Sequence, residues 1–270
     1  MLTAITEQEY KALAVYIKRH LGIHLGAEKK SLVQSRLLPA LEQRRLESFG
    51  QYFNYLERDA TGAALRELAA RLTTNHTYFY RESEHFRFLA SRVLPELERA
   101  VTSRDLRIWS AGCSYGQEPY TLAMLLADYF GDRKLSWDTK VLATDISPKA
   151  IEEAKRGVYK QEDAEQLPER WRRAYLQPQG EGLCAIKPLI KSEVLYRTLN
   201  LIHPFPFRKP FHVIFCRNVM IYFDAETRNA LLRRFYEALA PGGYLFVGHS
   251  ESVSREETDF HYVMPAVYRK

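Results

Sequence analysis

The chain has 270 residues, of which 46% are hydrophobic and 27% charged, and this balance excludes a largely disordered protein. Its three cysteines are too few and too scattered for a disulfide framework or a four-thiolate zinc site. The formal net charge of +6 favours acidic partners without choosing among nucleic acid, anionic lipid and acidic protein. The first residues show no secretory-signal pattern, and no apolar run reaches the length of a bilayer, so we expect a soluble cytoplasmic protein.

The first hundred residues have the apolar spacing of helices, and no alternating strand pattern interrupts them. Apolar side chains recur three or four residues apart at Leu13, Ile17, Leu21, Leu37, Leu41, Phe49, Phe53 and Leu56. We predict an all-α N-terminal domain over residues 1–80. A linker over residues 81–103 follows, with a helix from Glu82 to Ala100.

From residue 104 onward, strands alternate with helices. The expected strands are 106–110, 141–144, 211–216 and 244–247, and the expected helices are 119–130, 148–156 and 226–239. This order predicts an α/β domain over residues 104–270 with a mostly parallel sheet covered by helices on both faces. Ligands of such sheets bind at the carboxyl ends of the strands, near a topological switch point.

Residues 161–198 break this alternation. Gly180, Gly182 and Pro188 lie among two short candidate strands, 183–186 and 193–198. We predict a small antiparallel β-subdomain inserted here, whose second candidate strand returns to the main sheet.

The segment from Arg107 to Pro119 reads RIWSAGCSYGQEP, a strand followed by a turn of small residues and then a helix. Pro119 is expected at the first helical position, which favours proline. Such a turn lets backbone amides approach a ligand closely, but the phosphate-loop and dinucleotide glycine patterns are absent. Glu118 would repel a phosphate and attract a cation, which favours S-adenosylmethionine, a sulfonium without phosphate.

Two other predicted strands also end in polar residues. Asp145 follows the strand 141–144 at the place where ribose hydroxyls would lie, and a carboxylate suits a diol. The alternative for Asp145 is a cap on the helix that starts near Pro148. Arg217 and Asn218 follow the strand 211–216 and are placed for ligand contact.

Five motifs, in chain order, resemble those of the CheR family of chemoreceptor glutamate methyltransferases. They are TNHTYFYRE at 74–82, WSA through EPY at 109–120, ATDI at 143–146, FCRNVMIYFD at 215–224 and GHSE at 248–251. The similarity extends from about Tyr10 to Tyr268. It implies an all-α domain, then a Rossmann-like domain that binds S-adenosylmethionine and carries a small antiparallel β-subdomain.

The resemblance also implies site residues, position by position. Cofactor contacts are expected at Asn75, Thr77, Arg81, Glu118, Asp145, Asn200, Leu201, Arg217 and Asn218. We assign Arg81 to the methionine carboxylate, Glu118 or a backbone carbonyl to the ammonium, and Asp145 to the ribose. Arg217 and Tyr222 are the expected catalytic residues, which orient the incoming glutamate, with Tyr222 beside the transferring methyl.

The implied activity is that of a protein-glutamate O-methyltransferase. It would methylate glutamates on the cytoplasmic helical bundle of chemoreceptors for sensory adaptation, and release S-adenosylhomocysteine. A glutamate is already ionised at neutral pH, so no general base is needed, and positioning and desolvation should dominate the rate.

Two features bear on how the receptor would be recruited. The basic residues Lys29, Lys30, Arg36, Arg44 and Arg45 form either a face for an acidic bundle or a solvated surface. The loop 177–182 is short for gripping a receptor tether by strand addition, so we expect independence from a C-terminal pentapeptide.

Two alternatives stay open: a methyltransferase of the same fold that acts on nucleic acid or a small molecule, and a non-catalytic cofactor sensor. We expect a monomer with no nucleic-acid partner and no membrane insertion. His20 and His24 lack a third ligand, and Cys113 and Cys216 have the pattern of buried thiols, so no metal site is expected. His249 either shapes the pocket or bonds a backbone group.

Overall fold

The computed structural model describes residues 4–73, 76–254 and 257–270, and the chain divides into two compact units. The first unit comprises residues 1–74 together with 222–228, and the second comprises 75–221 and 229–270. Within the described residues, no helix has both the length and the apolar content that a membrane span requires.

The first unit is helical, as the apolar spacing predicted. Its helices are α1 (Glu7–Leu21), a short 3-10 helix (Ala27–Lys29), α2 (Lys30–Gln43), α3 (Phe49–Arg58) and α4 (Ala63–Leu72). Thr6 and Glu9 form a reciprocal capping box at the start of α1. Of the eight apolar residues expected to face inward, seven are buried and Phe53 is half-buried. The unit therefore has its own hydrophobic core.

The segment 222–228 belongs to this helical unit although it is distant from it in sequence. Lys18 Nζ lies 2.6 Å from an oxygen of Asp224, and the His24 amide donates to the carbonyl of Tyr222 over 2.8 Å. The ion pair is the largest cause of a lowered pKa at Asp224. Sequence order alone gave no sign of this grouping.

The second unit begins with the linker, which is a continuous helical stretch from Ser83 to Ala100. It consists of α5 (Ser83–Phe88), one π-helical turn (Leu89–Val93) and α6 (Leu94–Ala100). The other helices of this unit are α7 (Gln117–Phe130), α8 (Pro148–Arg156), α9 (Glu169–Tyr175) and α10 (Pro188–Lys191), with 3-10 turns at Gly131–Ser136 and Glu162–Ala164. Helix α11 (Ala225–Ala238) and the 3-10 turn at Met220–Tyr222 begin or end within the segment 222–228 and lie otherwise in the second unit.

A seven-stranded sheet forms the centre of the second unit, in the order β6-β2-β1-β7-β8-β10-β9. Its strands are β1 (Ile108–Ala111), β2 (Val141–Asp145), β6 (Val194–Thr198), β7 (Phe211–Cys216), β8 (Leu239–Val247), β9 (His261–Met264) and β10 (Val267–Arg269). The first five in spatial order pair in parallel, and β10 pairs antiparallel with both β8 and β9. The predicted parallel sheet is confirmed. The strands β9 and β10 near the C-terminus, and their antiparallel pairing, were not predicted.

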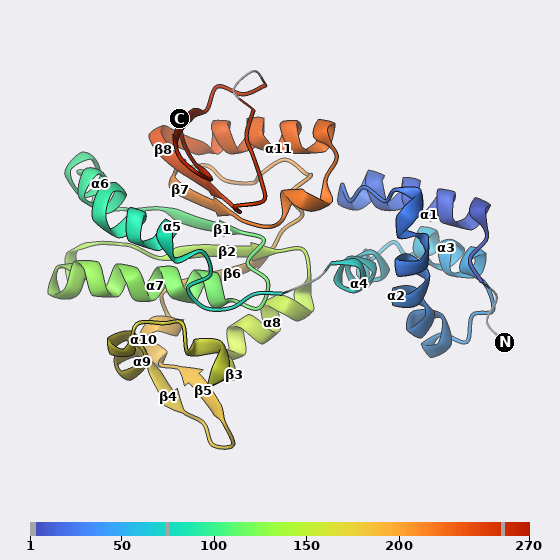
Figure 1. Cartoon of the computed structure of the whole chain (residues 1–270), viewed down its shortest axis with the longest axis horizontal. Coiled ribbons are helices and arrows are strands. Elements are labelled where there is room, and N and C mark those ends of the chain that lie inside the picture. Colours follow the sequence, from blue (N-terminus) through green and yellow to red (C-terminus); the bar gives the residue numbers. More distant parts are fainter. Residues whose placement is uncertain (1–3, 74–75, 255–256) are drawn as a thin grey trace. The chain divides into compact units, whose positions relative to one another are not determined.

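Helices cover both faces of this sheet, with α7 and α11 on opposite sides (Figure 1). The strands β1 and β7 are neighbours at the centre of the sheet. From β1 the chain crosses through α7 to β2 on one side, and from β7 it crosses through α11 to β8 on the other side. Right-handed crossovers in opposite directions place their helices on opposite faces. The carboxyl ends of β1 and β7 are therefore the topological switch point at which ligands bind.

The insert forms a separate three-stranded antiparallel sheet of β3 (Val158–Lys160), β5 (Leu183–Ile186) and β4 (Leu176–Pro178), in that order. The antiparallel character predicted for 183–186 is confirmed, as is the return of the next strand, now β6, to the main sheet. The small sheet starts at Val158, three residues before the start predicted for the insert. The predicted insert extended to 198 and so included β6, which belongs to the main sheet.

Candidate functional site

The turn after β1 lies against the end of β2. The amides of Gly112 and Cys113 both donate to the carbonyl of Thr144, over 2.8 and 2.9 Å. Gly112 has a φ of +84°, a backbone conformation that favours glycine. The helix that follows starts at Gln117, with Gly116 as its N-cap, so Pro119 occupies the third helical position and not the first as predicted.

Asp145 ties this turn to the start of α8. One carboxylate oxygen accepts the Ser114 amide over 2.8 Å, and the other accepts the Ser147 amide over 2.9 Å. Burial raises the pKa of Asp145, and these amide bonds oppose that rise. The N-cap of α8 is Ser147, so capping does not account for Asp145. A carboxylate has about four lone-pair sites, so Asp145 has acceptor capacity left for a diol.

The residues Asn200 and Leu201 lie next to this acid, because the neighbouring Leu199 amide donates to the Asp145 carbonyl over 3.0 Å. Asn200 turns the chain, since its side-chain oxygen accepts the Ile202 amide over 3.2 Å. Leu201 is buried, and its carbonyl accepts from Arg234 over 2.8 Å. The structure therefore brings together at the end of β2 two positions that lie far from Asp145 in sequence.

Arg217, the first residue after β7, bridges two largely buried carboxylates. Its guanidinium lies 3.0 Å from Glu118 of α7 and 3.0 Å from Glu82, and it also donates to the carbonyl of Arg81. The side chain of Arg217 is 3% exposed, and those of Glu82 and Glu118 are 12% and 15% exposed. Charges held this far from water interact strongly.

The pKa values of the two acids shift in opposite directions. Burial raises the pKa of Glu118, although Arg217 and a 2.7 Å hydrogen bond from Ser110 oppose the rise. Burial also acts to raise the pKa of Glu82, but the guanidinium of Arg217 outweighs it and leaves that pKa lowered. With all three groups ionised, two carboxylates and one guanidinium carry a net charge of one negative unit.

This charge fits S-adenosylmethionine. A sulfonium and an ammonium with one carboxylate give the cofactor a net charge of one positive unit, which complements the acid pair and its single arginine. A ribose diol requires acceptors such as the carboxylate of Asp145, and the role of Asp145 in binding it stays a prediction. The charged groups near the ends of β1, β2 and β7 thus match a cationic nucleoside and disfavour a phosphate.

The other residues expected at the site are placed less directly. Arg81 donates to the His76 carbonyl over 2.9 Å and is half-exposed, and Thr77 is also half-exposed. Asn218 follows Arg217 in a left-handed conformation, with a φ of +59°. Asn75 lies outside the described residues, and Tyr222 belongs to the helical unit. The roles of these residues stay predictions.

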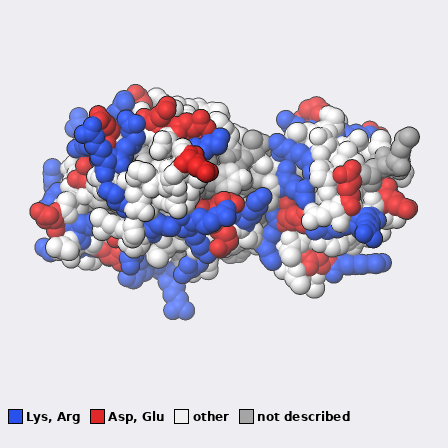
Figure 2. All heavy atoms as spheres, turned by 90° about the horizontal axis from the view of Figure 1, so that it is seen from below, with Lys and Arg blue, Asp and Glu red and all other residues white. Residues whose placement is uncertain are grey.

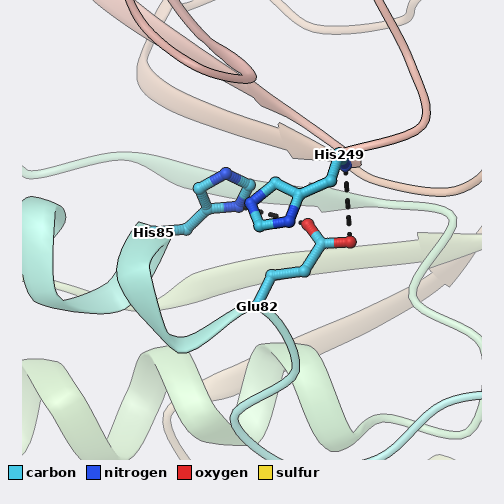
Figure 3. A group of neighbouring side chains, drawn as sticks. All are labelled: Glu82, His85 and His249. Atoms are coloured by element: carbon cyan, nitrogen blue, oxygen red, sulfur yellow. Dashed lines mark hydrogen bonds and ion pairs between the residues drawn. The ribbon is translucent and has the colours of Figure 1, made fainter.

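Glu82, His85 and His249 form a cluster whose candidate ligand atoms lie within 4.8 Å of one another (Figure 3). His85 is fully buried, and desolvation, assisted by the charge of Arg217, lowers its pKa to about 4. A neutral imidazole beside a carboxylate is a ligand pattern for zinc. However, the same Glu82 carboxylate already pairs with Arg217, and a divalent cation there would meet that guanidinium. We therefore infer no metal site from this cluster.

Sequence reasoning missed three residues that support the site. Glu82 is the last residue of the TNHTYFYRE motif and was given no role, yet it pairs with Arg217 and accepts the His249 amide over 3.4 Å. Ser110 donates to Glu118 from within β1. Glu251 ends the GHSE motif, and its contacts are described below. Membership of a motif was the one signal available for Glu82 and Glu251.

Comparisons with known proteins agree with this geometry. The family model described as "CheR methyltransferase, SAM binding domain" matches residues 75–268, and "CheR methyltransferase, all-alpha domain" matches residues 8–73. A protein of Borreliella burgdorferi named chemotaxis protein methyltransferase is 41% identical over 270 residues, which cover 98% of this chain and 95% of that protein. Chemotaxis protein methyltransferase 1 of Pseudomonas aeruginosa is 39% identical, over 91% of this chain and 90% of its own. The chemotaxis protein methyltransferase of Escherichia coli is 37% identical, over 95% and 88%.

Proposed function

Because the chain belongs to the CheR methyltransferase family and carries its S-adenosylmethionine-binding domain, we propose that it methylates glutamate side chains of chemoreceptor cytoplasmic domains. The products would be glutamate methyl esters and S-adenosylhomocysteine, and the reaction would serve sensory adaptation. The observation that carries this proposal is the match over nearly the whole chain to proteins named chemotaxis protein methyltransferase.

The proposed reaction requires no proton transfer by the protein. When bound, S-adenosylmethionine supplies an electrophilic methyl group on a sulfonium. The acceptor carboxylate is ionised at neutral pH, so the chain's residues have to hold it, strip its water and align it. The buried carboxylates near Arg217 are paired or hydrogen-bonded, which suits a positioning role and not that of a proton-transfer base.

We propose that Arg217 and Tyr222 orient the incoming glutamate. Arg217 is held rigidly by Glu82 and Glu118, which fixes where any remaining N–H group points. The test is the pH dependence of turnover in Tyr222→Phe and Arg217→Lys. We expect lower kcat with a profile that stays flat around neutral pH. A bell-shaped profile whose limbs shift with either substitution would show that one of these residues transfers a proton.

The receptor-binding role considered for the basic N-terminal residues has weaker support than the sequence suggested. Lys30 pairs with Glu7, Arg44 pairs with Glu67, and Arg36 donates to the Leu72 carbonyl. Of the five, Lys29 and Arg45 are exposed, and the other three are half-buried. On the face shown in Figure 2, acidic side chains are interspersed among the basic ones. Receptor binding by this group would thus depend on Lys29 and Arg45, and on whether a receptor can break the ion pairs of Lys30 and Arg44.

We also propose that activity does not depend on a receptor C-terminal pentapeptide. The connection between β4 and β5 is a tight turn, closed by hydrogen bonds between Gln179 and Leu183 (3.0 Å) and between Leu183 and Gly180 (2.8 Å). A turn of this length offers little surface beyond the strands themselves. Calorimetry with such a pentapeptide should show no binding, and a measurable dissociation constant would refute this part of the proposal.

We place the enzyme in the cytoplasm as a monomer, where the receptor bundle would be its substrate. The decisive experiment incubates the protein with methyl-labelled S-adenosylmethionine and receptor cytoplasmic fragments, then releases volatile methanol with alkali. Label released from the wild-type fragment and absent from one with its candidate glutamates changed to alanine supports the proposal. Salt-sensitive RNA binding with no base-labile label would favour a nucleic-acid enzyme. Cofactor binding without turnover on any acceptor would favour a sensor.

A further inference from the structure

Glu251 makes an unusual set of contacts for a side chain that the predicted chemistry does not use. Its carboxylate is buried and accepts four backbone amides. One oxygen accepts from Val219 over 2.9 Å and from Met220 over 2.7 Å, and the other accepts from Asn218 over 2.8 Å and from Gly248 over 2.6 Å. These amides come from two segments, one after β7 and one after β8.

The turn after β7 depends on such an acceptor. Three successive amides, from Asn218 to Met220, point to one place, and no secondary structure pairs them. Convergent backbone amides make an anion-binding concavity. Asn218 has a left-handed φ of +59°, a conformation that is uncommon outside glycine although asparagine adopts it more readily than most residues. The Glu251 carboxylate accepts the three amides that this turn leaves without a backbone partner.

The same turn lies directly against the turn after β1. A side chain at Gly112 would place its Cβ 2.4 Å from a methyl carbon of Val219, so the two turns touch with no room to spare. Gly248 is similarly confined. A Cβ there would lie 2.6 Å from the side-chain nitrogen of Asn218 and 2.9 Å from a carboxylate oxygen of Glu251. A shift of residues 218–220 would therefore disturb the glycine turn as well.

Glu251 is also linked to the acid that holds Arg217. The amide of His249, in the turn that Glu251 closes with Gly248, donates to Glu82 over 3.4 Å. Glu82 in turn pairs with Arg217. One short turn after β8 thus contacts both the backbone of Asn218 and the partner of Arg217.

We propose that Glu251 is a positioning residue, which holds Arg217, Asn218 and the Gly112 turn in the arrangement that binds S-adenosylmethionine. It acts through these residues and not on the reacting atoms, because its oxygens are already occupied by backbone amides. The inference rests on the proposed placement of the cofactor at Arg217 and Asn218, and it is independent of which acceptor receives the methyl group.

The test is calorimetric binding of S-adenosylhomocysteine to the full chain, with Glu251→Gln as the main variant. Glutamine keeps the shape but turns an N–H₂ group toward two of the four amides. We expect its dissociation constant to rise at least tenfold at unchanged stoichiometry. A purely structural role would lower the stoichiometry, since part of the protein would be unfolded, and leave the dissociation constant of the folded fraction unchanged.

A control is Glu193→Gln, which neutralises a partly buried acid that pairs with Lys134 elsewhere in the same unit. Its dissociation constant should equal that of the wild type even if its stability falls. Glu251→Ala, if it folds, should bind no better than Glu251→Gln.

Two outcomes overturn the inference: a wild-type dissociation constant in Glu251→Gln, or a wild-type protein that does not bind S-adenosylhomocysteine at all. Failure of the proposed function has a different signature, namely normal cofactor binding by the wild type with no ester formed on any receptor fragment. The two proposals can therefore fail separately.

Discussion

Replacing Arg217 by methionine should destabilise the second unit strongly. Methionine has a similar length but no charge, so Glu82 and Glu118 would lose the guanidinium that lies 3.0 Å from each. Removing one partner of a buried ion pair typically costs about 3–5 kcal/mol, because the remaining charge stays buried without compensation. With side-chain exposures of 3% for the arginine and 12% and 15% for the acids, this range applies here.

The assay is urea unfolding followed by tryptophan fluorescence. All three tryptophans, Trp109, Trp137 and Trp171, lie in the second unit, so their emission reports this unit without contribution from the helical one. The control is Arg87→Met, which removes an exposed pair with Glu84 in the same unit and should cost less than about 1 kcal/mol.

The pH dependence gives a second check. Loss of Arg217 raises the pKa values of both acids in the folded variant relative to its unfolded chain, because the guanidinium acts to lower each. As the pH falls through these raised values, the folded variant binds protons more readily than the unfolded chain, so its deficit relative to wild type should shrink. A deficit within about 1 kcal/mol of the Arg87→Met control, or one that grows toward acid pH, would refute the reasoning.

Three further predictions concern single positions. Asp145→Asn should weaken S-adenosylhomocysteine binding roughly 10- to 100-fold in calorimetry, since a charge-assisted hydrogen bond contributes about 1.5–3 kcal/mol; unchanged affinity would remove Asp145 from the site. His85 has a pKa lowered to about 4, so the unfolded chain binds a proton there before the folded one does as the pH falls from about 6.5. The wild type should therefore lose about 2 kcal/mol more than His85→Phe between pH 7.5 and 5 in urea unfolding, and equal losses would contradict this. Gly112→Ala should destabilise the unit by more than about 1 kcal/mol, given its φ of +84° and a Cβ position 2.4 Å from Val219, whereas the open Gly180→Ala control should lose less.

Much of the fold followed from local patterns. Buried parallel strands such as β7 read as continuous apolar runs, and helices such as α1 show apolar residues three and four apart, so both types were recognised. The short strands β3, β4, β9 and β10 were missed as strands, because three or four residues carry too little pattern and their pairing depends on distant partners. The grouping of residues 222–228 with the helical unit depends on contacts such as Lys18 with Asp224, which no local pattern encodes.

The candidate site also has a part that the sequence predicted and a part that it did not. The sequence by itself determined that Glu118, Asp145 and Arg217 follow or flank strand ends, since the carboxyl ends of parallel strands meet at one edge of the sheet. It also placed these residues in motifs shared with one family. Only the tertiary structure decided that Arg217 pairs with Glu82 as well as Glu118, and that Glu251 collects four amides. Such pairing depends on distances of about 3 Å between residues that lie far apart in the chain, and only the folded chain sets those distances.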